Sequence, residues 1–306
     1  MGNRVREGSG ETRPRSGQAW EDLGQPGARS ETAGSGARQS DGVQVTAPPP
    51  ARDPLPTRVW GLPPFPENAR AVLDAGLPAV GGALPSGAPA CLEDHVRLLL
   101  AWNASINLSG IREPAAIARD HILDSLAGLP VLRRAGIDEF VDLGSGAGFP
   151  GLPLAVALPA RRALLVESIA KKARFLVAAT EAMGLADRVE VAAARAESIA
   201  ADPRHRSRWP AVLSRAMADL AELAELALPL VAGGGLLVAW KRRPFDEELD
   251  RARAAVAGLG GRIAGVEQVA VPGLEDHVLV IVEKVGRTPS QYPRDPAARR
   301  RRPLGG

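Results

Sequence analysis

From about residue 139, short apolar runs alternate with stretches that carry apolar residues at helical spacing. The short runs are rich in Val, Leu and Ala, which is typical of buried β-strands. The expected strands are 139–143, 162–167, 188–193, 211–215 and 235–240, and the expected helices between them are about 151–158, 170–183, 218–228 and 245–258. This alternation predicts an α/β fold with a parallel sheet covered by helices on both faces.

The pattern changes towards the C-terminus, where two β-rich runs follow each other. Residues 263–271 and 278–285 are joined by the turn-forming segment 272–277. They predict a terminal hairpin with an antiparallel strand. Seven strands with this ending favour the Rossmann-like sheet of class I methyltransferases, because a dinucleotide-binding sheet normally finishes without such a hairpin.

Two amphipathic helices precede the predicted sheet. An apolar stripe runs from about residue 90 to Trp102, and a second one covers 117–126. The segment 107–114 between them contains Gly and Pro and is expected to be a loop. We interpret these helices as a small N-terminal cap on the sheet domain.

Composition divides the rest of the chain. Residues 1–60 are rich in Gly, Pro, Ser and Arg, with only scattered large apolar residues, so they are expected to form a disordered extension. We assign 61–135 to a linker and the helical cap, 136–286 to the methyltransferase-like domain and 287–306 to a basic tail. The extension is interpreted as a solvated linker, with an Arg- and Gly-rich tether for RNA as the alternative.

The cysteine count and the apolar pattern restrict location and chemistry. The 306 residues contain one cysteine, Cys91, which excludes an internal disulfide and fits a reducing cytoplasm. We interpret Cys91 as a small buried residue rather than a nucleophile, since only His95 is placed to activate it. The four histidines are scattered, so no metal site is expected. No long apolar stretch suggests a secretion signal or a membrane anchor.

The net charge is only +3, but the positive charges are clustered. Arg299–Arg302 form an unbroken run, and Lys241–Arg243 form a second group. Such runs are usually solvated. The chain also contains a glycine-rich segment at 140–151 that is typical of a nucleotide-binding loop. Beside such a loop the clustered cations are also candidate phosphate contacts, because polyanion binding needs several cations.

The richest motif is the segment 140–151, which passes from a strand through a glycine-rich turn into a helix. Gly144, Gly146 and Gly148 allow backbone N–H groups to approach a ligand closely. The next strand ends in Glu167, at the spacing where an acid binds the hydroxyls of a ribose. Two alternatives remain at this point. Glycines 146, 148 and 151 also spell the G-x-G-x-x-G of a dinucleotide oxidoreductase, and the turn can exist without any ligand.

Four blocks of residues resemble one known family over roughly 90–295. The chain is similar to the 16S rRNA guanine-N7 methyltransferases called RsmG or GidB. The blocks are Asn107–Ser109 with Ile111–Pro114 and His121–Leu126; Asp142–Pro153; Glu167–Ser168 with Lys171–Lys172 and Phe175–Leu176; and Arg195–Glu197 with Ser214–Ala216. The tail also resembles the closing motif of the family, at Thr288–Pro289, Tyr292–Arg294 and Pro303–Leu304. It departs from the family at Trp240–Arg242, where Lys-Gly is usual, and in the residues after Arg294, which lack the customary glycine and spaced lysines.

The resemblance implies a function. It implies methyl transfer from S-adenosylmethionine to N7 of one guanosine in a conserved hairpin loop of the decoding region, with 16S rRNA, the small ribosomal subunit or its precursor as the partner of a monomeric, cytoplasmic enzyme. The N7 lone pair is free at neutral pH, so in-line alignment matters more than a strong general base. The rival functions are an NAD-type oxidoreductase and a non-enzymatic RNA-binding protein. No catalytic residue is assigned.

The resemblance also implies site residues. The cofactor-binding set is Gly144, Phe149, Asp142, Gly146, Glu167, Ala196, Glu197 and Arg215, and the candidate RNA contacts are Asn107, His121, Lys241, Arg242 and Arg294. Gly144 and Phe149 are expected on the amino-acid and sulfonium side of the cofactor, Glu167 at its ribose, and Ala196 with Glu197 at its adenine.

Several of these residues have a second interpretation. Asp142 binds the ammonium group of the cofactor or caps the turn, and Glu197 borders adenine or is a solvated charge at a helix start. Arg215 faces the cofactor, a phosphate or Glu197. His121 and Asp124 orient the guanine, or they form a hydrogen-bonded pair at positions i and i+3 of one helix.

Overall fold

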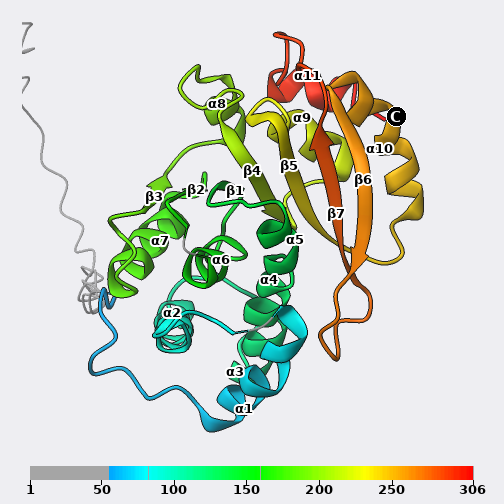
Figure 1. The fold of residues 1–306 in the computed structure, drawn as a ribbon. Coiled ribbons are helices and arrows are strands. Elements are labelled where there is room, and N and C mark those ends of the chain that lie inside the picture. Colours follow the sequence, from blue (N-terminus) through cyan, green and yellow to red (C-terminus); the bar gives the residue numbers. More distant parts are fainter. Residues whose placement is uncertain (1–54, 82, 159, 306) are drawn as a thin grey trace, which may run out of the picture. The chain divides into compact units, whose positions relative to one another are not determined.

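The computed structural model describes residues 55–81, 83–158 and 160–305. Within these ranges seven strands form one sheet in the order β3-β2-β1-β4-β5-β7-β6 (Figure 1). The first five strands are parallel, and β7 runs antiparallel to both β5 and β6. The strands are β1 (Glu139–Leu143), β2 (Arg162–Val166), β3 (Val189–Ala192), β4 (Trp209–Arg215), β5 (Val231–Arg242), β6 (Gly261–Gln268) and β7 (His277–Lys284). The predicted fold class and its terminal hairpin are confirmed.

Helices precede, separate and follow the strands. The cap contains α1 (Glu67–Gly76), the 3-10 turn η1 (Leu77–Val80), α2 (Ala88–Asn103), α3 (Pro114–Ile117), the π-helical segment η2 (Ala118–Leu123), α4 (Asp124–Leu126) and α5 (Leu129–Arg134). The sheet domain and the tail contain α6 (Gly151–Ala157), α7 (Ala170–Ala182), α8 (Ala196–Ala201), α9 (Leu220–Ala227), α10 (Asp246–Gly258) and α11 (Pro296–Arg301). None of the helices in the described part of the chain is both long and apolar enough to cross a membrane.

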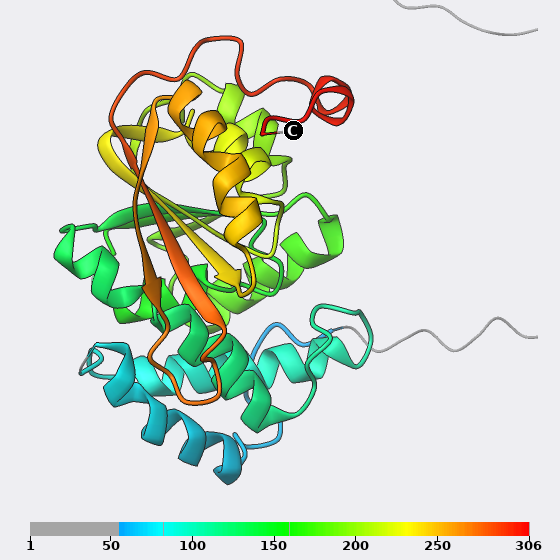
Figure 2. The ribbon, with the colours of Figure 1, turned by 90° about the vertical axis from the view of Figure 1, so that its right-hand side faces the viewer.

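Alternating side chains of the strands enter two separate cores. Phe140 and Leu165 belong to a core shared with the cap, α6 and α7. Val141 and Leu164, their neighbours along the strands, belong to a second core with α8, α9 and α10. The two groups of helices therefore cover opposite faces of the sheet (Figure 1, Figure 2). Burial on both faces explains why these strands have continuous apolar sequences.

The main differences from the predicted elements concern short segments. Helices α1, α5 and α11 were not expected from the sequence, α8 was anticipated only as the helix start at Glu197, and β4 and β5 begin earlier than predicted. The predicted extension 1–60 lies largely outside the described residues. Its last residues are described and contact the cap, because Trp102 Nε1 donates to the carbonyl of Pro56 and Arg97 donates to that of Val59.

The basic tail packs against the domain that precedes it. Tyr292 and Leu304 are partly buried against the second core. A Cβ on Gly305 would lie 2.5 Å from the carbonyl oxygen of Arg251 on α10, which shows how closely the end of the tail approaches that helix. The tail thus returns along the α9–α10 side of the sheet (Figure 2).

Candidate active site

The glycine-rich loop connects β1 to α6 at the carboxyl edge of the sheet. Gly144 and Gly148 have φ angles of +72° and +89°, which residues with a side chain rarely adopt. A Cβ on Gly148 would lie 2.5 Å from Leu152 Cδ1, and one on Gly144 would lie 3.1 Å from Met217. Both positions therefore require glycine. The loop lies where α/β sheets bind their ligands.

Asp142 lies on β1, just before this loop, and is completely buried. Its Oδ2 accepts a hydrogen bond of 3.1 Å from the N–H of Gly151, the first residue of α6. Its Oδ1 has no partner among the described residues. Burial raises the pKa of Asp142 to about 7. The structure thus shows the capping contact that the sequence left open, and the ammonium contact stays a prediction.

Glu167 follows β2 directly and is 6% exposed. Its Oε2 accepts from the N–H of Gly146 at 3.0 Å, and its Oε1 accepts from the N–H of Ile169 at 2.7 Å. A carboxylate has about four acceptor positions, so these two bonds leave lone pairs for further donors. The glycine loop and the acid are therefore held as one rigid unit.

A cleft of about 340 Å³ opens beside this unit. The ends of β1, β2 and β4, the starts of α8 and α9, and α11 surround it. We call it the cofactor cleft; its lining includes Gly144, Glu167, Ala196, Glu197, Ala216, Glu222 and Arg299. The two sequence motifs that predicted a nucleotide site are thus brought together with the α8 residues that the family resemblance assigned to adenine.

A second cavity, of about 470 Å³, lies on the cap side of β4. Residues of η2 and α4, the ends of β4 and β5, and the turn between β6 and β7 line it. Ala216, directly after β4, lines both this second cavity and the cofactor cleft. Two spaces with different linings therefore meet at one residue.

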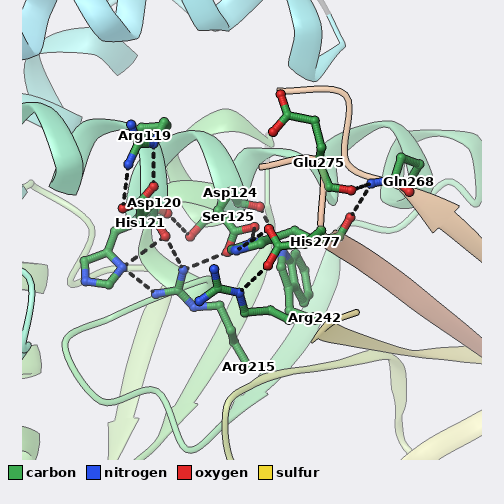
Figure 3. Close-up of polar contacts among 12 residues, drawn as sticks. Arg119, Asp120, His121, Asp124, Ser125, Arg215, Arg242, Gln268, Glu275 and His277 are labelled. Carbon is green, nitrogen blue, oxygen red and sulfur yellow. Dashed lines mark hydrogen bonds and ion pairs between the residues drawn. The ribbon is translucent and has the colours of Figure 1, made fainter. Parts of the chain in front are cut away.

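Arg215 is the central charge of the second cavity. Its guanidinium donates to Asp124 Oδ2 at 2.9 Å and to the carbonyl of Asp120 at 2.9 Å, and it lies 3.0 Å from His121 Nδ1 (Figure 3). Of the three partners that the sequence allowed, Glu197 is not the one observed. Arg215 faces the cap helix, and its predicted contact with the cofactor stays a prediction.

Asp124 connects three parts of the fold. Besides Arg215 it binds His277 Nδ1 of β7 through Oδ1 at 2.8 Å (Figure 3). Its carbonyl accepts from Trp240 Nε1 at 2.8 Å. The expected hydrogen bond between His121 and Asp124 is not among those of the described residues, so that interpretation was wrong in detail. Their side chains meet through Arg215 instead, in a segment that is π-helical rather than α-helical.

Phe149, in the glycine-rich loop, is buried against residues of the cap and of β4. Its ring is 4.6 Å from those of both His95 and His121, and the Arg215 guanidinium carbon lies 5.4 Å from its centroid. Burial, followed by the charge of Arg215, lowers the pKa of His121 to about 4. His121 is therefore neutral at pH 7, and it also lies 2.7 Å from the hydroxyl of Ser109 in the cap loop.

The predicted RNA contacts have different surroundings. Asn107 is exposed on the cap loop, and Arg242 is largely exposed beside Asp276, 3.1 Å away. Lys241 is engaged within the protein, because its ammonium donates to the carbonyl of Ala218 at 2.7 Å and pairs with Glu248 at 2.6 Å. Arg294 is likewise engaged within the protein, because its guanidinium donates to both carboxylate oxygens of Glu225. The exposed candidates remain available to RNA, whereas these two have structural contacts.

Three residues of the site were not found by the sequence reasoning. His277 was assigned only to a turn, because its partner Asp124 lies 153 residues away. His95 was considered only beside Cys91, yet it lies under the glycine loop, 2.8 Å from the carbonyl of Ala147. Arg299 was one member of a charge run, and no local signal separates it from the exposed arginines that follow it.

The sheet order, the glycine loop and the acid after β2 define an α/β enzyme of the class I methyltransferase type. A family model described as rRNA small subunit methyltransferase G matches residues 89–277. A relative of that name from Dehalococcoides mccartyi is 44% identical over 220 residues, which cover 72% of this chain and 93% of the relative. Another, from Roseiflexus castenholzii, is 43% identical over 67% of this chain and 87% of its own length. Among solved structures, the O-methyltransferase from Bacillus cereus in complex with SAH matches with a TM-score of 0.48 and 18% identity, over 72% of this chain and 98% of that chain.

The chain belongs to the rRNA small subunit methyltransferase G family. It is an rRNA methyltransferase that uses S-adenosylmethionine. The oxidoreductase and the non-enzymatic RNA-binding protein are thereby excluded as descriptions of its function.

Proposed function

We propose that this enzyme methylates N7 of one guanosine in the decoding region of 16S rRNA. The observation that carries the proposal is the meeting of the cofactor cleft and the second cavity at Ala216. Methyl transfer needs donor and acceptor aligned within one site, and alignment of this kind contributes up to about 7–11 kcal/mol to lowering a barrier. Two adjoining spaces at the carboxyl edge of the sheet can hold the two partners in this way.

The residues of the cofactor cleft fit S-adenosylmethionine. The free lone pairs of Glu167 suit ribose hydroxyls, and Gly144, which lines the cleft without a side chain, lets a ligand contact the backbone. Gly146, Phe149, Ala196 and Glu197 keep the roles expected from the family. When bound, the cofactor supplies an electrophilic methyl group.

The second cavity is proposed to hold the guanine. Guanine N7 needs no deprotonation, so the chain has to place the base rather than remove a proton. Methylation leaves positive charge on the purine, and the two carboxylates that line this cavity, Asp120 and Asp124, are each paired with an arginine, Arg119 and Arg215. The low pKa of His121 keeps its imidazole neutral, so it does not repel that charge. Arg215 is neutralised by Asp124 and is left to orient the base or a phosphate.

Mapping the methyl group tests the proposal. Small ribosomal subunits and naked 16S rRNA from a strain without this activity would be incubated with the enzyme and labelled S-adenosylmethionine. Borohydride reduction and aniline then break RNA at 7-methylguanosine. We expect a single break in the decoding region, and label incorporated without a break would exclude N7. Two further expectations have their own tests: sedimentation of the purified enzyme for a monomer, and fractionation of cells for a cytoplasmic location.

A further inference from the structure

The C-terminal segment 287–305, here called the C-terminal arm, is fixed to the domain by ion pairs and hydrogen bonds. Arg206 donates to the carbonyl of Tyr292 at 2.7 Å. Arg294 forms a two-pronged pair with the carboxylate of Glu225 on α9, at 2.8 and 2.6 Å. Glu225 is 1% exposed, so this anchor is buried on one side. Pairs with this geometry are among the stronger ones in proteins.

Beyond this anchor the arm reaches the cofactor cleft. Arg299 of α11 is 8% exposed, although arginine is seldom so buried without partners. It donates to Glu197 of α8 at 2.8 Å, to Glu222 of α9 at 3.4 Å and to the carbonyl of Arg294 at 2.9 Å. The side chains of Arg299, Glu197 and Glu222 all line the cofactor cleft. One guanidinium thus joins the two helices that border the cleft.

Arg299 is buried, whereas the arginines that follow it are exposed. Arg300, Arg301 and Arg302 are exposed on the same short helix or at its end. Successive helical residues point about 100° apart, so a uniform run of arginines necessarily mixes inward and outward positions. The arm therefore carries an internal arginine and external ones of the same chemical type, which serve as natural controls for each other.

We propose that the C-terminal arm forms a wall of the methyl-donor cleft and that Arg299 is a positioning residue, which holds Glu197 in the orientation that binds S-adenosylmethionine. The proposal rests on the location of the cofactor in this cleft. Burial alone would raise the pKa of Glu197, but its hydrogen bond and ion pair with Arg299 more than offset this, so the pKa lies below its ordinary value. Glu197 is thus kept as an anion with a fixed geometry.

Removing Arg299 changes the net charge of the cleft, and this change alone would strengthen the binding of a cationic ligand, which is the opposite of the proposed effect. Removal of Arg299 leaves Glu197 and Glu222 without their shared cation, which makes the cleft more negative. A cationic ligand would then be attracted more strongly by charge alone. A loss of S-adenosylmethionine affinity after removal of Arg299 would therefore be due to the changed orientation of Glu197 and not to the changed net charge.

The test measures binding by calorimetry with the full-length protein. The variants are Arg299→Met, Arg299→Lys and, as matched control, Arg301→Met on the exposed side of α11. We expect Arg299→Met to weaken both S-adenosylmethionine and the uncharged-sulfur product S-adenosylhomocysteine about tenfold, Arg299→Lys to recover part of the loss, and Arg301→Met to bind as the parent does. Unchanged or tighter binding by a folded Arg299→Met protein would overturn the proposal.

Two further measurements separate the possible reasons for failure. In a Glu197→Gln background, Arg299→Met should weaken binding less than twofold, because Arg299 acts through Glu197. A full tenfold loss in that background would assign Arg299 a direct contact instead and overturn the positioning role. Glu167→Ala tests the cleft itself: if it leaves binding unchanged, the location of the cofactor is wrong, whereas if it weakens binding and Arg299→Met does not, only the role of the arm is wrong.

Discussion

Glu167 has an observed structural role and, in the proposed function, a ligand-binding role as well. Its two oxygens already accept from the backbone of Gly146 and Ile169. These bonds fix the carboxylate with respect to the glycine loop, so a ribose would meet an acceptor whose orientation is set before binding. Such preorganisation lowers the entropic cost of recognition.

Replacing this acid should weaken cofactor binding. Glu167→Ala removes up to two charge-assisted hydrogen bonds, each worth roughly 1.5–3 kcal/mol. We expect at least a tenfold loss of S-adenosylmethionine affinity in calorimetry. Glu167→Gln is the control, since it keeps one acceptor and the shape of the side chain and should lose less. Unchanged affinity in a folded Glu167→Ala protein would remove the ribose assignment.

His95 illustrates a buried group that affects stability rather than chemistry. It is fully buried under the glycine loop, and burial lowers its pKa to about 4. Because the unfolded chain binds a proton near the ordinary pKa of about 6.5, stability is full above that pH and falls as the pH decreases towards 4. Burial lowers the pKa of His121 similarly, so this residue adds to the loss of stability at acid pH. Burial raises the pKa of Asp142 to about 7, so its contribution to the unfolding free energy increases as the pH decreases from 7 to 4.

A single variant isolates the contribution of His95. His95→Gln keeps a donor for the carbonyl of Ala147 and cannot titrate. From pH 7 to pH 5 the parent should lose about 1–2 kcal/mol more unfolding free energy than the variant. Urea unfolding at the two pH values measures this difference. Parallel pH profiles for the two proteins would show that His95 does not contribute to the acid sensitivity.

At the scale of elements, the contact between the cap and the sheet depends on Asp124. It lies in the cap and binds β4 through Arg215 and β7 through His277. Trp240, at the end of β5, donates to its carbonyl. Three strands and one cap helix are thereby joined at the second cavity, so the cap is a wall of the site as well as a cover for the sheet.

Breaking one of these links should separate cofactor binding from transfer. Arg215→Met leaves Asp124, whose side chain is 2% exposed, with only His277. We expect the unfolding free energy to fall by roughly 3 kcal/mol and methylation of small subunits to be lost, while S-adenosylmethionine affinity stays within about threefold. A large loss of cofactor affinity would instead restore the role in cofactor binding that the sequence suggested for Arg215.

Elements with periodic or continuous apolar patterns were predicted well, and those that depend on distant partners were not. All seven strands were expected near their observed positions, because burial on both faces leaves a strong signal. Helix α11 was missed, since its six residues are mostly arginine and only the contacts of Arg299 with Glu197 and Glu222 explain its position. The same limit applies to His277 in the site.

The C-terminal arm has an internal side and an exposed side. Arg299 and Arg294 point to acids inside the protein, whereas Arg287 and the three arginines after Arg299 are exposed. Replacing the whole run of four would therefore disturb the cofactor cleft as well as any RNA surface. An RNA test has to keep Arg299.

The exposed arginines that follow Arg299 are the part of the C-terminal arm that we expect to contact RNA. Replacing Arg300, Arg301 and Arg302 with serine should lower the slope of log K against log[salt] by up to about 2, since single-stranded RNA gives roughly 0.7 per phosphate. Cofactor affinity should not change. Binding isotherms at three salt concentrations measure the slope. Parallel lines for parent and variant would place the RNA surface elsewhere, with Arg242 and the cap loop as the next candidates.

Ala216 is the residue at which the cofactor cleft and the second cavity adjoin. It is a non-glycine residue in the left-handed region, with φ of +55°, and it belongs to the linings of both cavities. A bulkier or β-branched side chain is disfavoured by this backbone and would take up space in the cavities that it lines, while glycine would relax the backbone and leave more space there. In the proposed function, donor and acceptor therefore meet beside a residue whose side chain is a single methyl group, so substitutions at this position test the alignment of the two partners.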